Sequence, residues 1–278
     1  MREDHSVAAI TDASASPDAA MLFASIEAAY ECPSLDGLSD RRVHAIRKTV
    51  KKARAALRVL RPAMADSDYD AIENALRDRG RRYAALRDAR SLIDALEAFS
   101  ERYAKKLRGC DLSPLEEELA TARLEARRDL ARPPSDEGAC ATSLEAFRAI
   151  VRRGDLGHVR AANLEKGLRR LRRKVRERFA RAKRERTTEA LHAWRKQVKY
   201  VLNAAGALRK GKLRPSRDVE RRADRLAELL GDDHDLAALH DAVRGSTLGE
   251  SQRDRVERLI AGRRKKLQRR AFAQGRKL

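Results

Sequence analysis

Two nine-residue stretches decide the fold: VHAIRKTVK at residues 43–51 and LHAWRKQVK at residues 191–199. They share the pattern apolar-His-Ala-x-Arg-Lys-x-Val-Lys and lie 148 residues apart. Apolar residues recur in both at steps of three and four, which is the period of an amphipathic α-helix with one buried face. Each stretch therefore predicts a helix with a buried seam and, beside it, a row of basic side chains.

A second pair of similar segments lies further along the chain. Arg87-Asp88 opens a segment that continues to Leu96, and His234-Asp235 opens a similar one that continues to Val243, 147 residues later. Two matches in the same order and at nearly the same offset predict an internal duplication of one helical unit.

The composition predicts an all-α protein. Charged residues make up 38% and aromatic residues only 4%, and Ala, Leu and Arg dominate, which favours long amphipathic helices over a large sheet. Ser39 is expected to cap a helix that stops at Pro62, and Gly231 is expected to end one helix before an Asp caps the next. We expect helices at about 17–31, 39–61, 67–108, 114–130, 143–152, 158–184, 188–209, 215–230, 235–244 and 247–275.

The strongest linker signal is the run RPPSDEG at residues 132–138, close to the middle of the chain. It predicts a first helical bundle at 38–131, a linker at 132–142 and a second bundle at 143–278. Residues 1–37 are predicted to be an acidic, partly disordered leader with a short helix, since residues 1–40 hold eight acidic residues and one Arg.

The first basic row follows the buried seam around the helix. Nine Lys or Arg and no acid occur from residue 41 to residue 61. Like charges at helical spacing repel each other, so we expect a bound polyanion to compensate the row. Its members recur at steps of three and four over roughly 21 Å of helix: His44, Arg47, Lys51, Arg54 and Arg58.

The second row is shorter. His192, Arg195 and Lys199 repeat its start, but Leu202 and Gly206 then interrupt it. The part shared by both rows is His-x-x-Arg-Lys-x-x-Lys, which adds Lys48 and Lys196. Imidazole and cationic side chains in this pattern can donate hydrogen bonds to phosphate oxygens, and imidazole can gain a proton beside phosphate.

At these residues the chain resembles the conserved histidine α-helical domain family. The resemblance rests on VHAIRK, LHAWRK, LRDARSL and LGDDHDLAAL in their order, and covers about residues 38–275. It implies two four-helix bundles related by pseudo-two-fold symmetry and a basic cleft that binds inorganic polyphosphate, often on polyphosphate granules. The implied contacts are His44, Arg47, Lys48, Lys51, His192, Arg195, Lys196 and Lys199, with Arg54 and Arg58 extending the first row.

The net charge of +21 leaves sequence-nonspecific nucleic-acid binding as the alternative function. The scarcity of aromatic residues disfavours single-strand binding, which uses stacking platforms. The 13 Lys or Arg within residues 160–186 surround a predicted helix, so we expect a general electrostatic wall there and no shaped site.

We expect no enzymatic activity, no cofactor and no metal site. The one cluster that could hold a cation lies at residues 232–235, and helix capping is the simpler interpretation of it. The chain has no apolar run of membrane-spanning length and no signal peptide, so we expect it in the cytoplasm. The family resemblance implies an association with polyphosphate granules there.

Overall fold

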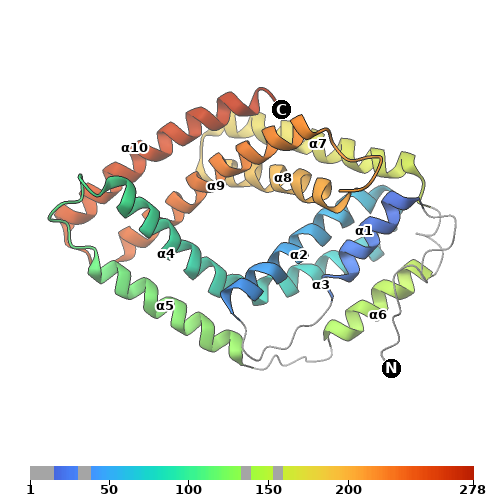
Figure 1. The fold of residues 1–278 in the computed structure, drawn as a ribbon, viewed down its shortest axis with the longest axis horizontal. Coiled ribbons are helices and arrows are strands. Elements are labelled where there is room, and N and C mark those ends of the chain that lie inside the picture. The colour runs from blue at the N-terminus through green and yellow to red at the C-terminus, as the bar shows by residue number, and fades with distance from the viewer. Residues whose placement is uncertain (1–15, 31–38, 133–138, 153–158) are drawn as a thin grey trace. The chain divides into compact units, whose positions relative to one another are not determined.

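The computed structural model describes residues 16–30, 39–132, 139–152 and 159–278, and helix is the only regular secondary structure in these ranges. The all-α prediction is therefore confirmed, whereas the internal duplication stays a prediction. Figure 1 labels the α-helices. The helices are α1 Pro17–Glu27, α2 Asp40–Leu60, the short 3-10 helix η2 Arg61–Ala63, α3 Asp66–Arg82, α4 Ala84–Tyr103, α5 Ser113–Ala131, α6 Ala139–Arg152, α7 Ala161–Glu185, α8 Thr188–Ala207, α9 Arg217–Gly245 and α10 Glu250–Gly275.

The helices form two compact units. Unit 1 comprises Met1–Arg82, Pro133–Glu177 and Gln197–Arg221, and unit 2 comprises Tyr83–Arg132, Arg178–Lys196 and Arg222–Leu278. Each unit thus takes residues from both sides of the expected linker, of which 133–138 lie outside the described residues. The predicted division at 132–142 follows the sequence repeat, whereas the compact units follow spatial contacts.

The short helix of the predicted leader belongs to the core of unit 1. Ser16 caps α1 by accepting a hydrogen bond from the backbone N–H of Ala19 at 3.2 Å. Leu22, Phe23 and Ile26 are at most 2% exposed, and α1 packs on α2. Within the predicted leader, Pro17–Glu27 therefore supply a buried apolar helix face to unit 1.

A glycine sets how closely α7 approaches α2 in unit 1. A Cβ built on Gly167 would lie 2.0 Å from the carbonyl oxygen of Val59, so only glycine fits at this crossing. Leu164 on α7 and Leu60 on α2 are fully buried nearby along their helices. The basic residues on either side of Gly167 are thereby held at the end of α2.

Unit 2 is built around an aromatic cluster. The ring of Trp194 on α8 stacks on Phe272 of α10 with centroids 5.7 Å apart, and its centroid lies 5.0 Å from that of Phe179 on α7. Leu226 and Leu230 of α9 are buried as well. Because Trp194 belongs to the LHAWRK motif, this core fixes the orientation of the second basic row.

Two expected helix boundaries are wrong. The helix expected at 67–108 is interrupted at Tyr83, where φ is −99° and ψ is 8° and the side chain is 4% exposed. The helices expected at 215–230 and 235–244 are one helix, α9, which continues through Gly231. A Cβ on Gly231 would lie 3.7 Å from Nη2 of Arg195, so this glycine sits beside an arginine within a helix and ends nothing.

None of the described helices is both long enough and apolar enough to cross a membrane.

Candidate functional site

The first basic row lies on α2 as predicted. Ser39 caps the helix by accepting a hydrogen bond from the backbone N–H of Arg42 at 3.3 Å. The expected seam is buried at Val43, Val50, Ala53, Leu57 and Leu60, and Ile46 is half-buried. One residue further around the helix, His44, Lys48 and Lys51 are exposed, whereas Arg47, Arg54 and Arg58 are half-buried. The row therefore has an exposed N-terminal part and a more buried C-terminal part.

Arg47 is anchored to the neighbouring helix. Its Nη1 donates a hydrogen bond to the carbonyl oxygen of Gly80 at 3.1 Å, near the C-terminus of α3. A cation is favourable at this end of a helix, where carbonyl groups lack intrahelical partners. The contact fixes the position of the guanidinium group beside the exposed part of the row.

The C-terminal part of the row is paired with a carboxylate of the chain itself. Arg54 donates to Glu73 at 2.5 Å, and Arg58 donates to both oxygens of Glu73 at 2.9 and 3.0 Å. Glu73, on α3, is only 5% exposed. Glu73 therefore supplies part of the counter-charge for Arg54 and Arg58, and their contact with a polyanion stays a prediction.

The pKa of Glu73 agrees with this arrangement. Burial alone would raise the pKa of the carboxyl group, but hydrogen bonds from Arg58 and Arg54 outweigh burial and hold the pKa below its usual value. Arg58 also lies over the ring of Tyr200 on α8, 3.9 Å from the ring centroid. Arg54 and Arg58 thus connect α2 to α3, and Arg58 connects it to α8.

The second row lies on α8, also as predicted. Leu191, Trp194, Val198, Val201, Ala205 and Leu208 are buried and form the expected seam. His192 and Lys196 are exposed, and Arg195 and Lys199 are half-buried. Gly206, where the row is interrupted, is exposed and has nothing within 4 Å of a built Cβ.

Within unit 2 the second row meets two further basic residues. The rings of His192 and His234 lie 4.5 Å apart between centroids. Burial, followed by the charges of His192, Arg195 and Arg87, lowers the pKa of His234 to about 4, while Asp88 opposes the shift. The imidazole of His234 is therefore neutral at pH 7 and lies in a strongly positive environment.

Two polar atoms of this cluster are buried without a hydrogen-bond partner among the described residues: Nδ1 of His234 and Nε of Arg195. The pKa of Arg195 is lowered by burial, with Asp235 opposing and Arg87 adding to the shift. Buried polar groups normally have partners, so these two atoms are unusual, but their burial leaves no surface through which a ligand could reach them directly. We define this set, Arg87, His192, Arg195 and His234, as the histidine cluster.

His234 and Arg87 were absent from the predicted site residues, although the sequence carried a signal for them. They open the two matching segments that indicated duplication. In the structure His234 lies beside His192, and Arg87 lowers the pKa of both His234 and Arg195.

Of the aspartates at 232–235, Asp233 ties α9 to α10. Asp233 is 2% exposed and accepts hydrogen bonds from Arg264 at 3.1 Å and Gln268 at 2.9 Å, both on α10. Among the described residues no group of three or more His, Cys, Asp or Glu side chains is placed to hold a metal ion.

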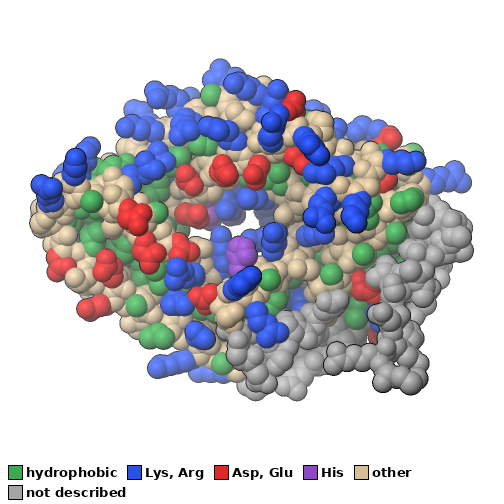
Figure 2. All heavy atoms as spheres, in the orientation of Figure 1, with side chains coloured by type: hydrophobic (Ala, Val, Ile, Leu, Met, Phe, Trp, Pro, Cys, Tyr) green, Lys and Arg blue, Asp and Glu red, His purple; other side chains and the backbone are tan. Residues whose placement is uncertain are grey.

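The face in Figure 2 shows Lys and Arg side chains spread over most helices, with Asp and Glu between them. Positive charge alone therefore identifies no site, and the arrangement of the rows must do so.

The family model of the CHAD domain matches residues 23–244. The chain belongs to the CHAD domain family. The matched residues include α2, α4, α8 and almost all of α9. Every member of both basic rows and of the histidine cluster therefore lies within the match. None of the curated proteins compared matches the chain.

Proposed function

We propose that this CHAD domain protein binds inorganic polyphosphate through its two basic rows. The observation that carries the proposal is the set of exposed basic side chains on one helix face in each row, with the second row beside the histidine cluster: His44, Lys48, Lys51, His192 and Lys196. A phosphate chain supplies closely spaced acceptor oxygens to such groups. The contacts are His44, Arg47, Lys48 and Lys51 on α2 and His192, Arg195, Lys196 and Lys199 on α8, and we assign Arg54 and Arg58 a structural role.

The aromatic residues of the rows favour polyphosphate over single-stranded nucleic acid. Trp194 is fully buried, and Tyr200 is 6% exposed and covered by Arg58. Neither ring can stack on a base, which is the main sequence-tolerant contact of single-strand binders. Duplex DNA needs no stacking, so it is the competitor that the test must include.

The test is a competition assay on the full chain at fixed, near-physiological salt. Immobilised protein is offered long-chain polyphosphate and duplex DNA at equal phosphate concentration, and we expect polyphosphate to be preferred. If duplex DNA competes as well as polyphosphate does, the proposal is wrong and nonspecific nucleic-acid binding becomes the favoured function.

The rows are tested with a matched pair of double variants. Lys48→Ala with Lys196→Ala removes one exposed lysine from each row, whereas Lys265→Ala with Lys266→Ala removes two exposed lysines from α10. We expect the row variant to bind polyphosphate at least tenfold more weakly, about 1.4 kcal/mol, and the control variant to bind almost as the parent does. Equal losses would mean that net charge alone drives binding.

We also propose that the chain binds polyphosphate without cleaving it. The buried carboxylates Glu73 and Asp233 are both engaged by arginine, and cleavage of phosphoanhydrides commonly uses carboxylate-bound metal ions. Polyphosphate incubated with the protein and Mg²⁺ should keep its length on a gel, and phosphate release would contradict the proposal.

A fluorescent fusion is expected in the cytoplasm on polyphosphate granules, and a diffuse signal in cells that contain granules would argue against that location.

A further inference from the structure

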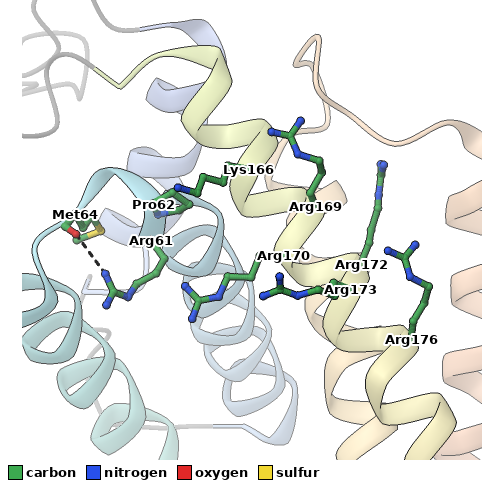
Figure 3. A pocket seen from close by; sticks show the side chains of 9 residues that line it. All are labelled: Arg61, Pro62, Met64, Lys166, Arg169, Arg170, Arg172, Arg173 and Arg176. Carbon is green, nitrogen blue, oxygen red and sulfur yellow. Dashed lines mark hydrogen bonds between the residues drawn. The ribbon is translucent and has the colours of Figure 1, made fainter.

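A basic pocket lies in unit 1, apart from both rows. Its volume is about 760 Å³, and it lies between the end of α2 and the first half of α7 (Figure 3). Seven of its nine lining residues are cationic and none is acidic: Arg61, Pro62, Met64, Lys166, Arg169, Arg170, Arg172, Arg173 and Arg176. No member of the two rows lines it. Residues 160–186, which we expected to form a general electrostatic wall, thus also line a pocket.

Two structural features build the pocket. The close approach at Gly167 brings α7 onto the carbonyl group of Val59, so that the α7 cations flank the end of α2. Lys166, Arg170 and Arg173 follow each other at steps of four and three, which places them on one face of α7. In Figure 3, Arg170 and Arg173 extend toward Arg61, whereas Arg169 and Arg172 extend away from it.

Arg61 closes the opposite side of the pocket. Its guanidinium group donates to the carbonyl oxygen of Met64 at 3.3 Å, pairs with Asp66 and lies 4.7 Å from the ring centroid of Tyr69. These contacts hold the cation in place and leave it on the pocket wall.

The pocket carries an excess of positive charge. Arg169 pairs with Glu165 at 3.2 Å, and Arg173 pairs with Glu177 at 3.3 Å. Both glutamates lie on α7, and neither of them lines the pocket. Lys166, Arg170, Arg172 and Arg176 have no ion-pair partner within the part of the chain that the structure describes. Cations crowded on one concave surface repel each other, and a bound anion with several charges relieves that repulsion.

We propose that this pocket binds a small molecule that carries several adjacent phosphate groups, such as a short condensed phosphate or a cyclitol polyphosphate. Only Pro62 and Met64 offer apolar surface, so a nucleobase or a lipid tail would gain little there. Arginine forks pair with phosphate oxygens through two hydrogen bonds, and the forks of Arg170 and Arg173 extending toward Arg61 fit several phosphates better than one. This site is additional to the rows and does not depend on the proposed function.

The test is isothermal titration calorimetry of the full chain with inorganic triphosphate and, in a separate arm, with inositol hexakisphosphate. The pocket variant is Arg170→Ala with Arg173→Ala, and the control on the same helix is Arg181→Ala with Arg184→Ala, which removes the same charge. All four side chains are at the surface, and helix content measured by circular dichroism checks that each variant folds.

We expect the pocket variant to lose at least tenfold in affinity for one or both probes, while the control stays within about twofold. The arm with the tighter binding identifies the linear or the cyclic source of phosphate. The row variant, Lys48→Ala with Lys196→Ala, should bind both probes as the parent does, even if the rows turn out not to bind polyphosphate. Equal losses in the pocket and control variants, or loss of both probes in the row variant, would overturn the pocket as a separate site.

Discussion

Glu73 lies where Arg54 and Arg58 of the first row converge. Its carboxylate accepts hydrogen bonds from Arg54 and Arg58, whose side chains are 21% and 19% exposed. Sequence periodicity placed both arginines in the row correctly, but their partner comes from α3, 15 to 19 residues away. No local pattern indicates which carboxylate of a neighbouring helix turns inward.

Glu73→Gln should destabilise the fold by about 3 kcal/mol, because it leaves two half-buried guanidinium groups without their counter-charge. The measurement is urea-induced unfolding at pH 7 followed by circular dichroism. Asp78→Asn is the matched control, since Asp78 pairs with Arg81 at the surface and such pairs contribute at most about 1 kcal/mol. A similar small effect of both substitutions would mean that Glu73 is not the structural counter-charge.

Because of His234, we expect a falling pH to lower the stability of the fold and to raise the affinity for polyphosphate. Its pKa is lowered to about 4 by burial and by neighbouring cations, whereas an unfolded histidine titrates near about 6.5. Between these two values the unfolded chain binds a proton that the folded chain does not, so this residue lowers stability as the pH falls. A bound polyanion favours the charged imidazole, so polyphosphate affinity should rise over the same range.

The check is to measure unfolding free energy and polyphosphate affinity from pH 7 to pH 4.5 for the parent and for His234→Gln. The charged groups around His234 are His192 and Arg195 on α8, Arg87 and Asp88 on α4, and Asp235 on its own helix. Carboxylates elsewhere titrate in both proteins, so the difference between the two curves isolates His234. Parallel curves for the parent and the variant would refute the assignment.

At the scale of the helices, apolar periodicity predicts most elements because a buried face recurs every three or four residues. It fails where tertiary packing decides. The break at Tyr83 has no Pro or Gly at that position, yet its buried ring lies where the helical geometry stops. Gly231 looks like a helix end in sequence, but α9 continues through it beside Arg195.

We expect replacement by alanine to change the stability in opposite directions at the two helical glycines Gly206 and Gly167. Gly206→Ala meets nothing within 4 Å and should stabilise the protein by about 0.5–1 kcal/mol, because alanine loses less backbone entropy on folding. Gly167→Ala would place a methyl group against the carbonyl group of Val59 and should destabilise by about 1–3 kcal/mol. Thermal melts of both variants test the pair, and a tolerated Gly167→Ala would mean that α7 does not need its close approach to α2.

At the scale of the whole molecule, the sequence predicts which residues form the basic rows, but it does not predict which residues of other helices surround them. The basic rows are local features of single helices, so their spacing can be read directly. The burial of α1, the histidine cluster and the pocket each join segments far apart in the chain, such as Arg61 with Arg170 or His192 with His234. Their construction depends on how helices pack, and in the pocket on the single close contact at Gly167.

The net charge of +21 predicts that polyphosphate affinity falls steeply with salt. Each cation that contacts a polyanion releases condensed counterions, so the logarithm of the binding constant falls linearly with the logarithm of salt concentration, by about 0.7 per contact for a single-stranded polyanion. If the rows bind the chain directly, Lys48→Ala with Lys196→Ala should make this slope shallower by about 1.4. The α10 variant, Lys265→Ala with Lys266→Ala, carries the same net charge but should keep the parent slope, because those lysines release no counterions on binding. Affinities measured from 50 to 300 mM salt distinguish the cases: equal slopes in the two double variants would show that the rows act only through the general field of a basic protein.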